Sequence, residues 1–344
     1  MKIGIDGRKI PGAAEHTPLE ILDHAERLGM EGVYFRTVLD ITPTLDRGVL
    51  REVRQHADEL GLYLQMGLAK VNPYAAAEAP EIRVLGDGDY TRGMLKMIEA
   101  CREGADCGEL WVACGNYKPD LPGYYAIDRF RSDAPWPDQL VAIEKFLRQL
   151  APAAREFDCH LNIETHEEIT STEVVRLVEA VGPDVLGITL DTANVLVRGE
   201  DAVAAARRVA PYTRATHLRD SILAPTDYGL TRTFSPCGLG VIDWAGVLGA
   251  LQAENPDLCA SIEPAGPTLA VPIGLSDDAW LELHPDLVEE ERKSLLASAR
   301  QYAERAARGE FPSVEEFRAV PYDGEDFILR SAAHLRGVLA GELS

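Results

Sequence analysis

Four ionisable residues end four consecutive apolar runs of the sequence. These are Glu164 in LNIETHEE, Asp191 in ITLDTAN, His217 in ATHLRD and Glu263 in ASIEPAG. A charged group at the end of a buried strand loses its hydration at a cost of several kcal/mol, unless it is paired or coordinated. Three carboxylates gathered in one place also repel one another unless a cation compensates them. The pattern therefore predicts a divalent-metal site made by these four side chains.

Three carboxylates and one imidazole suit Mn²⁺, Mg²⁺, Co²⁺ or Fe²⁺ at least as well as Zn²⁺, and we expect Mn²⁺ first. A cation on a carbonyl oxygen stabilises the enediolate that forms when the neighbouring carbon loses a proton. Each residue alone has a structural explanation as well, because a carboxylate at a strand end can cap a helix and a histidine can belong to the core. The coincidence of all four favours the metal site.

Two further residues follow these ligands at a spacing of two. His166 follows Glu164 and points to the same side if the strand continues, and an imidazole suits proton transfer near neutral pH. Its alternative role is a hydrogen bond that orients Glu164 or Asp191. Arg219 stands in the same relation to His217 and is predicted to hold a substrate oxygen, whereas its alternative role is a salt bridge to a ligand carboxylate.

Short β-rich runs that alternate with amphipathic helical patterns must position these residues, and this alternation is typical of a parallel sheet covered by helices. Eight such units favour a closed (β/α)8 TIM barrel, and no GxGxxG follows the first strand, as a dinucleotide-binding fold would require. The carboxyl ends of barrel strands meet at one face, where the predicted ligands would converge. The expected strands are 2–6, 32–36, 62–66, 109–114, 160–164, 185–191, 214–218 and 258–263.

The chain of 344 residues is expected to be one domain, with the barrel core over 1–265 and the last barrel helix and a C-terminal helical extension over 266–344. An insertion from Gly115 to about Trp136, after strand four, is rich in aromatic and cationic residues that suit a polyhydroxylated ring, although it could equally be a stabilising lid. Asn116 in this insertion and Arg36 at the end of strand two are predicted substrate-binding residues. Helices are expected over 288–308 and 326–341, the latter beyond the eight-unit count.

Composition excludes several classes of protein. The formal net charge of −22 would repel a phosphate backbone, so nucleic acid is not an expected partner. No stretch approaches the roughly 18 apolar residues that a membrane span needs. The opening MKIGIDGRKI predicts a strand rather than a secretory signal, and the cytoplasm is the expected location. Six cysteines without CxxC spacing are expected to be reduced.

The sequence resembles the xylose-isomerase-like barrel superfamily of sugar isomerases and epimerases over most of its length. The resemblance implies that Glu164, Asp191, His217 and Glu263 bind the metal together with substrate oxygens. It also implies that Glu164 and Glu263 act as paired acid and base. Asn194 stands where ketose epimerases carry a histidine, which argues against plain ketose epimerisation, and we count it among the substrate-binding residues. The motifs are IETHE at 163–167, LDTANV at 190–195, THLRD at 216–220, CGLGVIDW at 237–244 and SIEP at 261–264.

Within the superfamily, the insertion, the IETHE motif and the long tail are similar to the large subunits of bacterial C-glycoside deglycosidases. This resemblance implies a 3-oxo-glycoside substrate, whose ketone acidifies the C2 proton so that the aglycone leaves by elimination. It also implies a small partner subunit, with a homo-oligomer as the other arrangement. The alternatives are a ketose or hydroxypyruvate-type isomerase or epimerase, and a keto-inositol or dehydroshikimate type dehydratase.

Two remaining classes fit the sequence poorly. Type IV endonucleases share the fold, but Asn194 and Arg219 stand where their trinuclear zinc site would require histidines. A non-catalytic scaffold would be expected to have lost a metal ligand, and all four are present. We therefore expect a metal-dependent enzyme that acts on a small carbohydrate.

Overall fold

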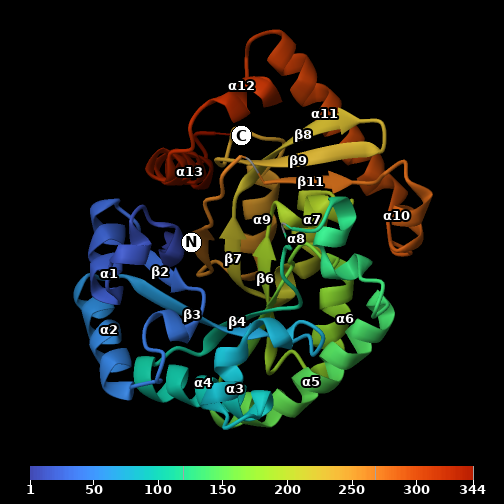
Figure 1. The fold of residues 1–344 in the computed structure, drawn as a ribbon. Helices are drawn as coiled ribbons and strands as arrows, with labels where there is room; N and C mark the ends of the chain where they lie inside the picture. Colours follow the sequence, from blue (N-terminus) through green and yellow to red (C-terminus); the bar gives the residue numbers. More distant parts are fainter. Residues whose placement is uncertain (119, 268, 344) are drawn as a thin grey trace.

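Eight parallel strands close into a barrel in the computed structural model of the chain (Figure 1), which describes residues 1–118, 120–267 and 269–343. The order around the barrel is β1-β10-β7-β6-β5-β4-β3-β2, so the last strand pairs with the first. The predicted (β/α)8 barrel is confirmed. Its strands are β1 Lys2–Asp6, β2 Gly32–Phe35, β3 Tyr63–Lys70, β4 Glu109–Ala113, β5 His160–Glu164, β6 Leu186–Asp191, β7 Thr213–Leu218 and β10 Cys259–Ile262.

One barrel strand is longer than the sequence predicts. The expected run 62–66 continues to Lys70, and its pairing with β4 shifts register between Gly67 and Lys70. A side chain at Gly67 could not be accommodated, because a Cβ atom there would lie 2.1 Å from the carbonyl oxygen of Arg36. The glycine lets β3 approach the end of β2 closely, and the bulge carries Lys70 to the carboxyl end of the barrel.

Helices surround the barrel, as the alternation of strand and helical patterns predicts. Two of them begin with a capping box in which a threonine and a glutamate satisfy each other's backbone N–H groups, Thr17 with Glu20 in α1 and Thr170 with Glu173 in α6. Their buried faces are apolar and pack on the strands. The helices up to the last barrel strand are α1 Pro18–Arg27, α2 Arg47–Glu59, α3 Pro80–Leu85, α4 Tyr90–Ala105, α5 Trp136–Glu156, α6 Ser171–Val181, α7 Asn194–Val197, α8 Ala202–Val209 and α9 Trp244–Glu254.

A second, three-stranded antiparallel sheet was not predicted. Strands β8 (Asp220–Thr226) and β9 (Gly229–Ser235) form a hairpin directly after β7, and β11 (Ala270–Ile273) pairs with β9. The sheet lies beside α11 (Glu289–Ala307), which packs against β8 (Figure 1). It therefore joins the chain after β7 to the chain after β10.

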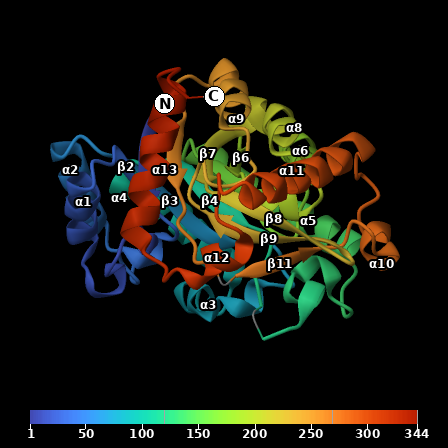
Figure 2. The same cartoon turned by 90° about the horizontal axis from the view of Figure 1, so that it is seen from above.

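The C-terminal helices differ in their relation to the barrel. Helix α13 (Gly324–Leu339) packs against α9, β1 and β10, so it fills the place of the eighth barrel helix (Figure 2). The expectation that 326–341 lies beyond the eight units is wrong, because α11, the earlier helix, covers the added sheet instead. The short helices α10 (Asp278–Glu282) and α12 (Val314–Ala319) connect these parts.

The insertion after β4 is anchored by a buried arginine. Arg129 donates to Glu173 Oε2 at 2.8 Å, and its guanidinium also bonds the carbonyl oxygen of Leu283. Trp136 donates its indole N–H to Glu173 Oε1 at 3.0 Å. Pro119, within the predicted insertion, and Thr268, within the tail, lie outside the described residues. The insertion is thus tied to the start of α6 and to the chain before α11.

The remaining expectations from composition concern cysteines and membranes. All six cysteines are free, as predicted. Among the residues that the structure describes, no helix combines the length and the apolar character needed to cross a membrane.

Candidate metal and substrate site

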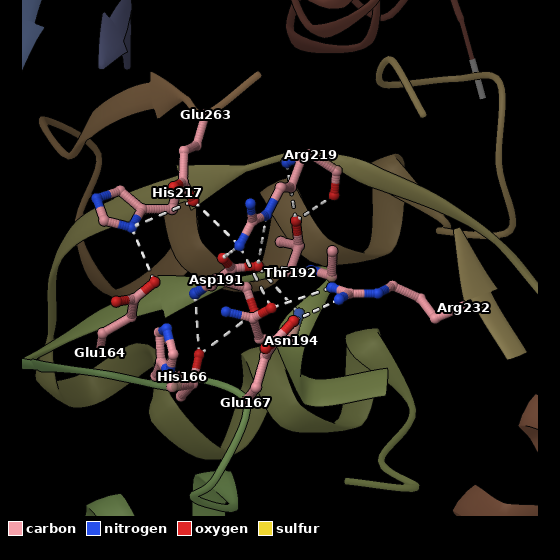
Figure 3. A network of polar contacts seen from close by, with 12 residues as sticks. Glu164, His166, Glu167, Asp191, Thr192, Asn194, His217, Arg219, Arg232 and Glu263 are labelled. Atoms are coloured by element: carbon pink, nitrogen blue, oxygen red, sulfur yellow. Dashed lines mark hydrogen bonds and ion pairs between the residues drawn. The ribbon is translucent and has the colours of Figure 1, made fainter. Parts of the chain in front are cut away.

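The four predicted ligands converge at the carboxyl end of the barrel (Figure 3). Glu164 ends β5, Asp191 ends β6, His217 lies on β7 and Glu263 follows β10. The parallel register places Asp191 opposite His217, and His217 opposite Ser261, two residues before Glu263. One ligand atom from each residue lies within 4.8 Å of all the others, and all four residues are buried.

The dimensions and chemistry of this cluster fit a divalent cation. Oxygen and nitrogen ligands lie about 2.0–2.2 Å from such ions, so two ligands on opposite sides are about 4 Å apart. Glu263 Oε2 is buried and, although the Arg219 guanidinium lies 3.1 Å away, it accepts no hydrogen bond among the described residues, so it keeps lone pairs for coordination. The cluster can therefore hold a divalent cation, with Glu164, Asp191, His217 and Glu263 as its ligands.

Charge interactions within the cluster are strong because its groups are desolvated. Burial opposes the ionisation of Glu164, but the His217 imidazole, 3.0 Å from its Oε1, holds the pKa of that carboxyl well below its usual range. Burial raises the pKa of Asp191 to about 6 in spite of its ion pair with Arg219. Positive charge at this point stabilises the ionised carboxylates.

Two aromatic residues that the sequence analysis missed fix the orientation of the ligands. Trp111 on β4 donates its indole N–H to Glu164 Oε2 at 3.0 Å. The Tyr34 ring on β2 lies 4.8 Å from the His217 ring, and its buried hydroxyl has no hydrogen-bond partner among the described residues. Partners of this kind hold metal ligands in one orientation.

Arg219 makes the salt bridge that was its alternative role. Its Nη2 lies 2.5 Å from Asp191 Oδ2 and 3.1 Å from Glu263 Oε2, so it joins two of the four ligands. Its guanidinium also stacks on Phe234 of β9, with Cζ 4.0 Å from the ring centre. Arg219 also lines a pocket beside the cluster, which we call the main pocket. It can therefore still make its predicted contact with a substrate oxygen.

His166 lies beyond the end of β5 and lines the same pocket. Its Nδ1 is 2.5 Å from Glu168 Oε2, so its hydrogen bond goes to Glu168 and not to Glu164 or Asp191. Although burial disfavours the charged ring, the Glu168 carboxylate raises the pKa of His166 to about 9. Its Nε2 has no hydrogen-bond partner among the described residues and is the atom left for proton transfer.

The main pocket has a volume of about 520 Å³. Of the predicted substrate-binding residues, it brings together Arg36, Asn116 and Arg219. Asn194 is fully buried and is not among the lining residues, and its Oδ1 accepts from Arg219 at 3.3 Å and from Arg232 at 3.1 Å. The pocket is lined by Lys9, Arg36, Asn116, Tyr117, Lys118, Asp120, His166, Glu167, Arg219, Phe234, Glu263, Ala265 and Leu269.

The unpredicted hairpin supplies one wall of this pocket. Phe234 on β9 faces it, and Arg232, two residues earlier, is buried behind it in an ion pair with Glu167. The Arg232 guanidinium lies 3.6 Å from the centre of the Phe234 ring, which is therefore stacked with two arginines. Only the alternating pattern of TRTFS could have indicated that this segment is a strand at the site.

Active sites of (β/α)8-barrel enzymes lie at the carboxyl-terminal face of the barrel. In this chain that face carries three carboxylates and a histidine around a polar pocket, which is the arrangement of a barrel enzyme. The family model described as xylose isomerase-like TIM barrel matches residues 22–296, and the chain belongs to this family.

Individual comparisons agree with this assignment. A 3-oxo-isoapionate decarboxylase from Pectobacterium atrosepticum is 27% identical over 112 residues, which cover 32% of this chain and 40% of that relative. The structure of an L-ribulose 3-epimerase is similar over 99% of this chain and 95% of its own, with a TM-score of 0.61 and 16% identity. A 3-keto-D-glucoside 4-epimerase from E. coli covers 85% of this chain and 99% of its own, with a TM-score of 0.55 and 14% identity.

Proposed function

We propose that this enzyme removes the proton next to the carbonyl of a keto-sugar, and that the reaction proceeds to eliminative cleavage of a 3-oxo-glycoside. The observation that carries the proposal is the position of His166, held by Glu168, on the wall of the same pocket that the metal cluster faces. A divalent cation bound by the cluster, with Mn²⁺ as our first expectation, would supply Lewis-acid polarisation of the substrate carbonyl.

Residues of the chain would remove the proton and bind the negative charge that develops. Glu168 holds one proton on His166 Nδ1, and Nε2 of the neutral ring accepts the C2 proton of the substrate. Because the pKa of His166 is about 9, the neutral ring is the minor form near pH 7 and activity should rise with pH towards 9. The electrons of the broken C–H bond form the C1–C2 double bond, and the aglycone leaves C1 with the electrons of its own bond. Arg219 and Arg36 line the pocket and can bind the oxygen on which negative charge develops.

Two comparisons support a keto-sugar as the substrate class. The relative from Pectobacterium and the structure from E. coli carry names that specify a 3-oxo and a 3-keto sugar derivative, respectively. The named epimerases also support a second candidate, in which reprotonation follows proton removal and Glu164 and Glu263 serve as the acid–base pair. Both reactions begin with the same proton abstraction.

The experiment is solvent deuterium incorporation at the carbon next to the ketone, measured by NMR with Mn²⁺-loaded protein. A 3-oxo-glucoside is compared with fructose-type ketoses. Aglycone release from the 3-oxo-glucoside supports elimination, exchange without release supports epimerisation of that substrate, and exchange with the simple ketose assigns an isomerase or epimerase of free ketoses. No exchange with either substrate, in the presence of any of the five expected cations, contradicts the proposal.

We also propose that a small partner subunit completes the pocket, as the resemblance to the deglycosidases implies. Co-purification from the native host, followed by activity assays of the chain with and without the partner, tests this point. Full activity of the isolated chain would count against a required partner, and size-exclusion chromatography would then decide whether a homo-oligomer takes its place.

A further inference from the structure

Two cationic side chains beside the metal cluster form no direct ion pair with a carboxylate of the described residues. Lys70, the last residue of β3, is 7% exposed, and its Nζ is buried without a hydrogen-bond partner in the described part of the chain. Arg36, directly after β2, makes no side-chain hydrogen bond or ion pair with any described residue; although burial disfavours its charge, the carboxylates of Glu263 and Glu164 raise the pKa of its guanidinium. A buried cation without a direct counter-ion, as at Lys70, is costly, and such groups are concentrated where a ligand compensates them.

Both cations lie against the same indole ring. Arg36 Cζ and Lys70 Nζ are each 5.2 Å from the centre of the Trp111 ring, which favours their positive charge. The close approach of β3 at Gly67 brings the two strand ends together. Trp111 also donates to the metal ligand Glu164. A single side chain thus adjoins the two cations and the cluster.

A pocket of about 300 Å³ lies at these cations. We call it the Lys70 pocket. Glu81 is the one carboxylate among its lining residues, and it is exposed. Arg8, Arg36 and Lys70 face this pocket in a chain whose net charge is −22; Arg8 is paired with Asp40, so Arg36 and Lys70 are the cations that a ligand can meet. Arg36 and Asn116 line both the Lys70 pocket and the main pocket, so the two adjoin. Its polar and charged lining residues are Arg8, Arg36, Thr37, Lys70, Glu81, Trp111 and Asn116.

We propose that the Lys70 pocket binds a carboxylate of the substrate, which is therefore a keto-sugar acid. The inference rests on the proposed function and specifies its substrate class. The planar guanidinium of Arg36 matches the two oxygens of a carboxylate, and the Lys70 ammonium adds a point charge. An acid group held there fixes one end of the substrate while its ketone reaches the metal cluster across Trp111.

The test measures binding, which does not depend on turnover. Isothermal titration calorimetry compares D-gluconate with its uncharged counterpart sorbitol on the metal-free and the Mn²⁺-loaded full chain. We expect gluconate to bind at least about tenfold more tightly than sorbitol, a difference that corresponds to one charge-assisted contact. Lys70→Met should abolish this preference, whereas Lys145→Met, which removes an exposed cation from α5, should leave it unchanged.

The melting temperature of Lys70→Met shows whether the variant has folded. Because the substitution removes a buried unpaired charge, we expect the melting temperature to stay the same or rise. Equal binding of gluconate and sorbitol by the wild type, or a gluconate preference that survives in folded Lys70→Met, overturns the proposal. A stronger preference for glucose 6-phosphate than for gluconate, lost in Lys70→Met, overturns the carboxylate assignment. Failure of the deuterium experiment leaves these binding results intact, so the two proposals fail separately.

Discussion

At the scale of single residues, the structure separates two histidines with different partners. His217 bonds to the carboxylate of Glu164 within the metal cluster, whereas His166 bonds to Glu168 on the wall of the pocket. Substitutions at the cluster should therefore affect metal binding, and substitutions at His166 should not. This separation distinguishes the proposed metal ligands from the proposed proton-transfer residue.

We expect Glu164→Gln to abolish turnover and to weaken Mn²⁺ binding, because it removes a ligand. His166→Ala should retain Mn²⁺ binding but lower kcat by about a hundredfold or more, the usual contribution of a general base. Mn²⁺ affinity by calorimetry and kcat by steady-state kinetics are the measurements. Glu109→Gln, at the opposite end of the barrel, is the matched control. Retained turnover in His166→Ala would remove that residue from the mechanism.

The sequence was sufficient to predict that the four proposed ligands cluster, because each ends or follows an apolar run whose end the barrel fixes in space. It was insufficient for Trp111 and Lys70. The contact of Trp111 with Glu164 depends on the lateral register of β4 and β5, which no local pattern encodes. Lys70 reaches the site only because β3 continues through a bulge beyond the predicted end. Contacts between strands, not residue types, were the missing information.

At the scale of elements, the hairpin β8–β9 is the part of the site that the prediction omitted. Its residues alternate as a strand requires, but two adjacent antiparallel strands do not fit an alternation of strands and helices. The eight barrel strands were found because each stands between helical patterns. The helix at 326–341 was placed outside the barrel because sequence order does not show which helix covers β10 and β1.

The hairpin should control substrate binding through Phe234, whose ring supports Arg219. Phe234→Leu retains apolar volume but loses the aromatic face, which contributes about 0.5–2 kcal/mol to each stacked cation. We expect KM to rise several-fold with a smaller change in kcat, because Arg219 loses its fixed position at the pocket. Phe234→Tyr keeps the ring and should behave like the wild type. An unchanged KM in Phe234→Leu would mean that the ion pairs of Arg219 suffice.

At the scale of the whole molecule, a buried charge network joins α11 to the barrel. Arg208 on α8 bridges Glu200 and Glu291, and Glu291 also accepts from the backbone of Asp201. Ser171, at the start of α6, donates to Glu200 from both its backbone and its hydroxyl. The ionisation state of Glu200 therefore affects contacts that join α6, α8 and α11.

This network predicts a pH dependence of stability. Burial raises the pKa of Glu200 to about 7 from 4.5, in spite of the hydrogen bonds from Ser171. The folded state then holds this proton more tightly than the unfolded state, so the stabilising contribution is complete below about pH 4.5 and is lost as the pH rises through about 7. Glu200→Gln cannot ionise, and we expect its melting temperature to gain on the wild type by several degrees between pH 5 and pH 8.

The control for this comparison is Glu315→Gln, which changes an exposed carboxyl group on α12. Its melting temperature should follow that of the wild type at every pH, as measured by differential scanning calorimetry. A constant difference between Glu200→Gln and the wild type across the range would show that Glu200 is ionised in the folded protein throughout.

The bridge that Arg219 forms between Asp191 and Glu263 has a consequence for the folding of the metal-free chain. An internal cation already balances part of the charge that a metal ion would neutralise. We therefore expect the chain to fold before any metal ion binds. Metal supply would then change the active fraction of the folded protein and not the folded fraction of the chain.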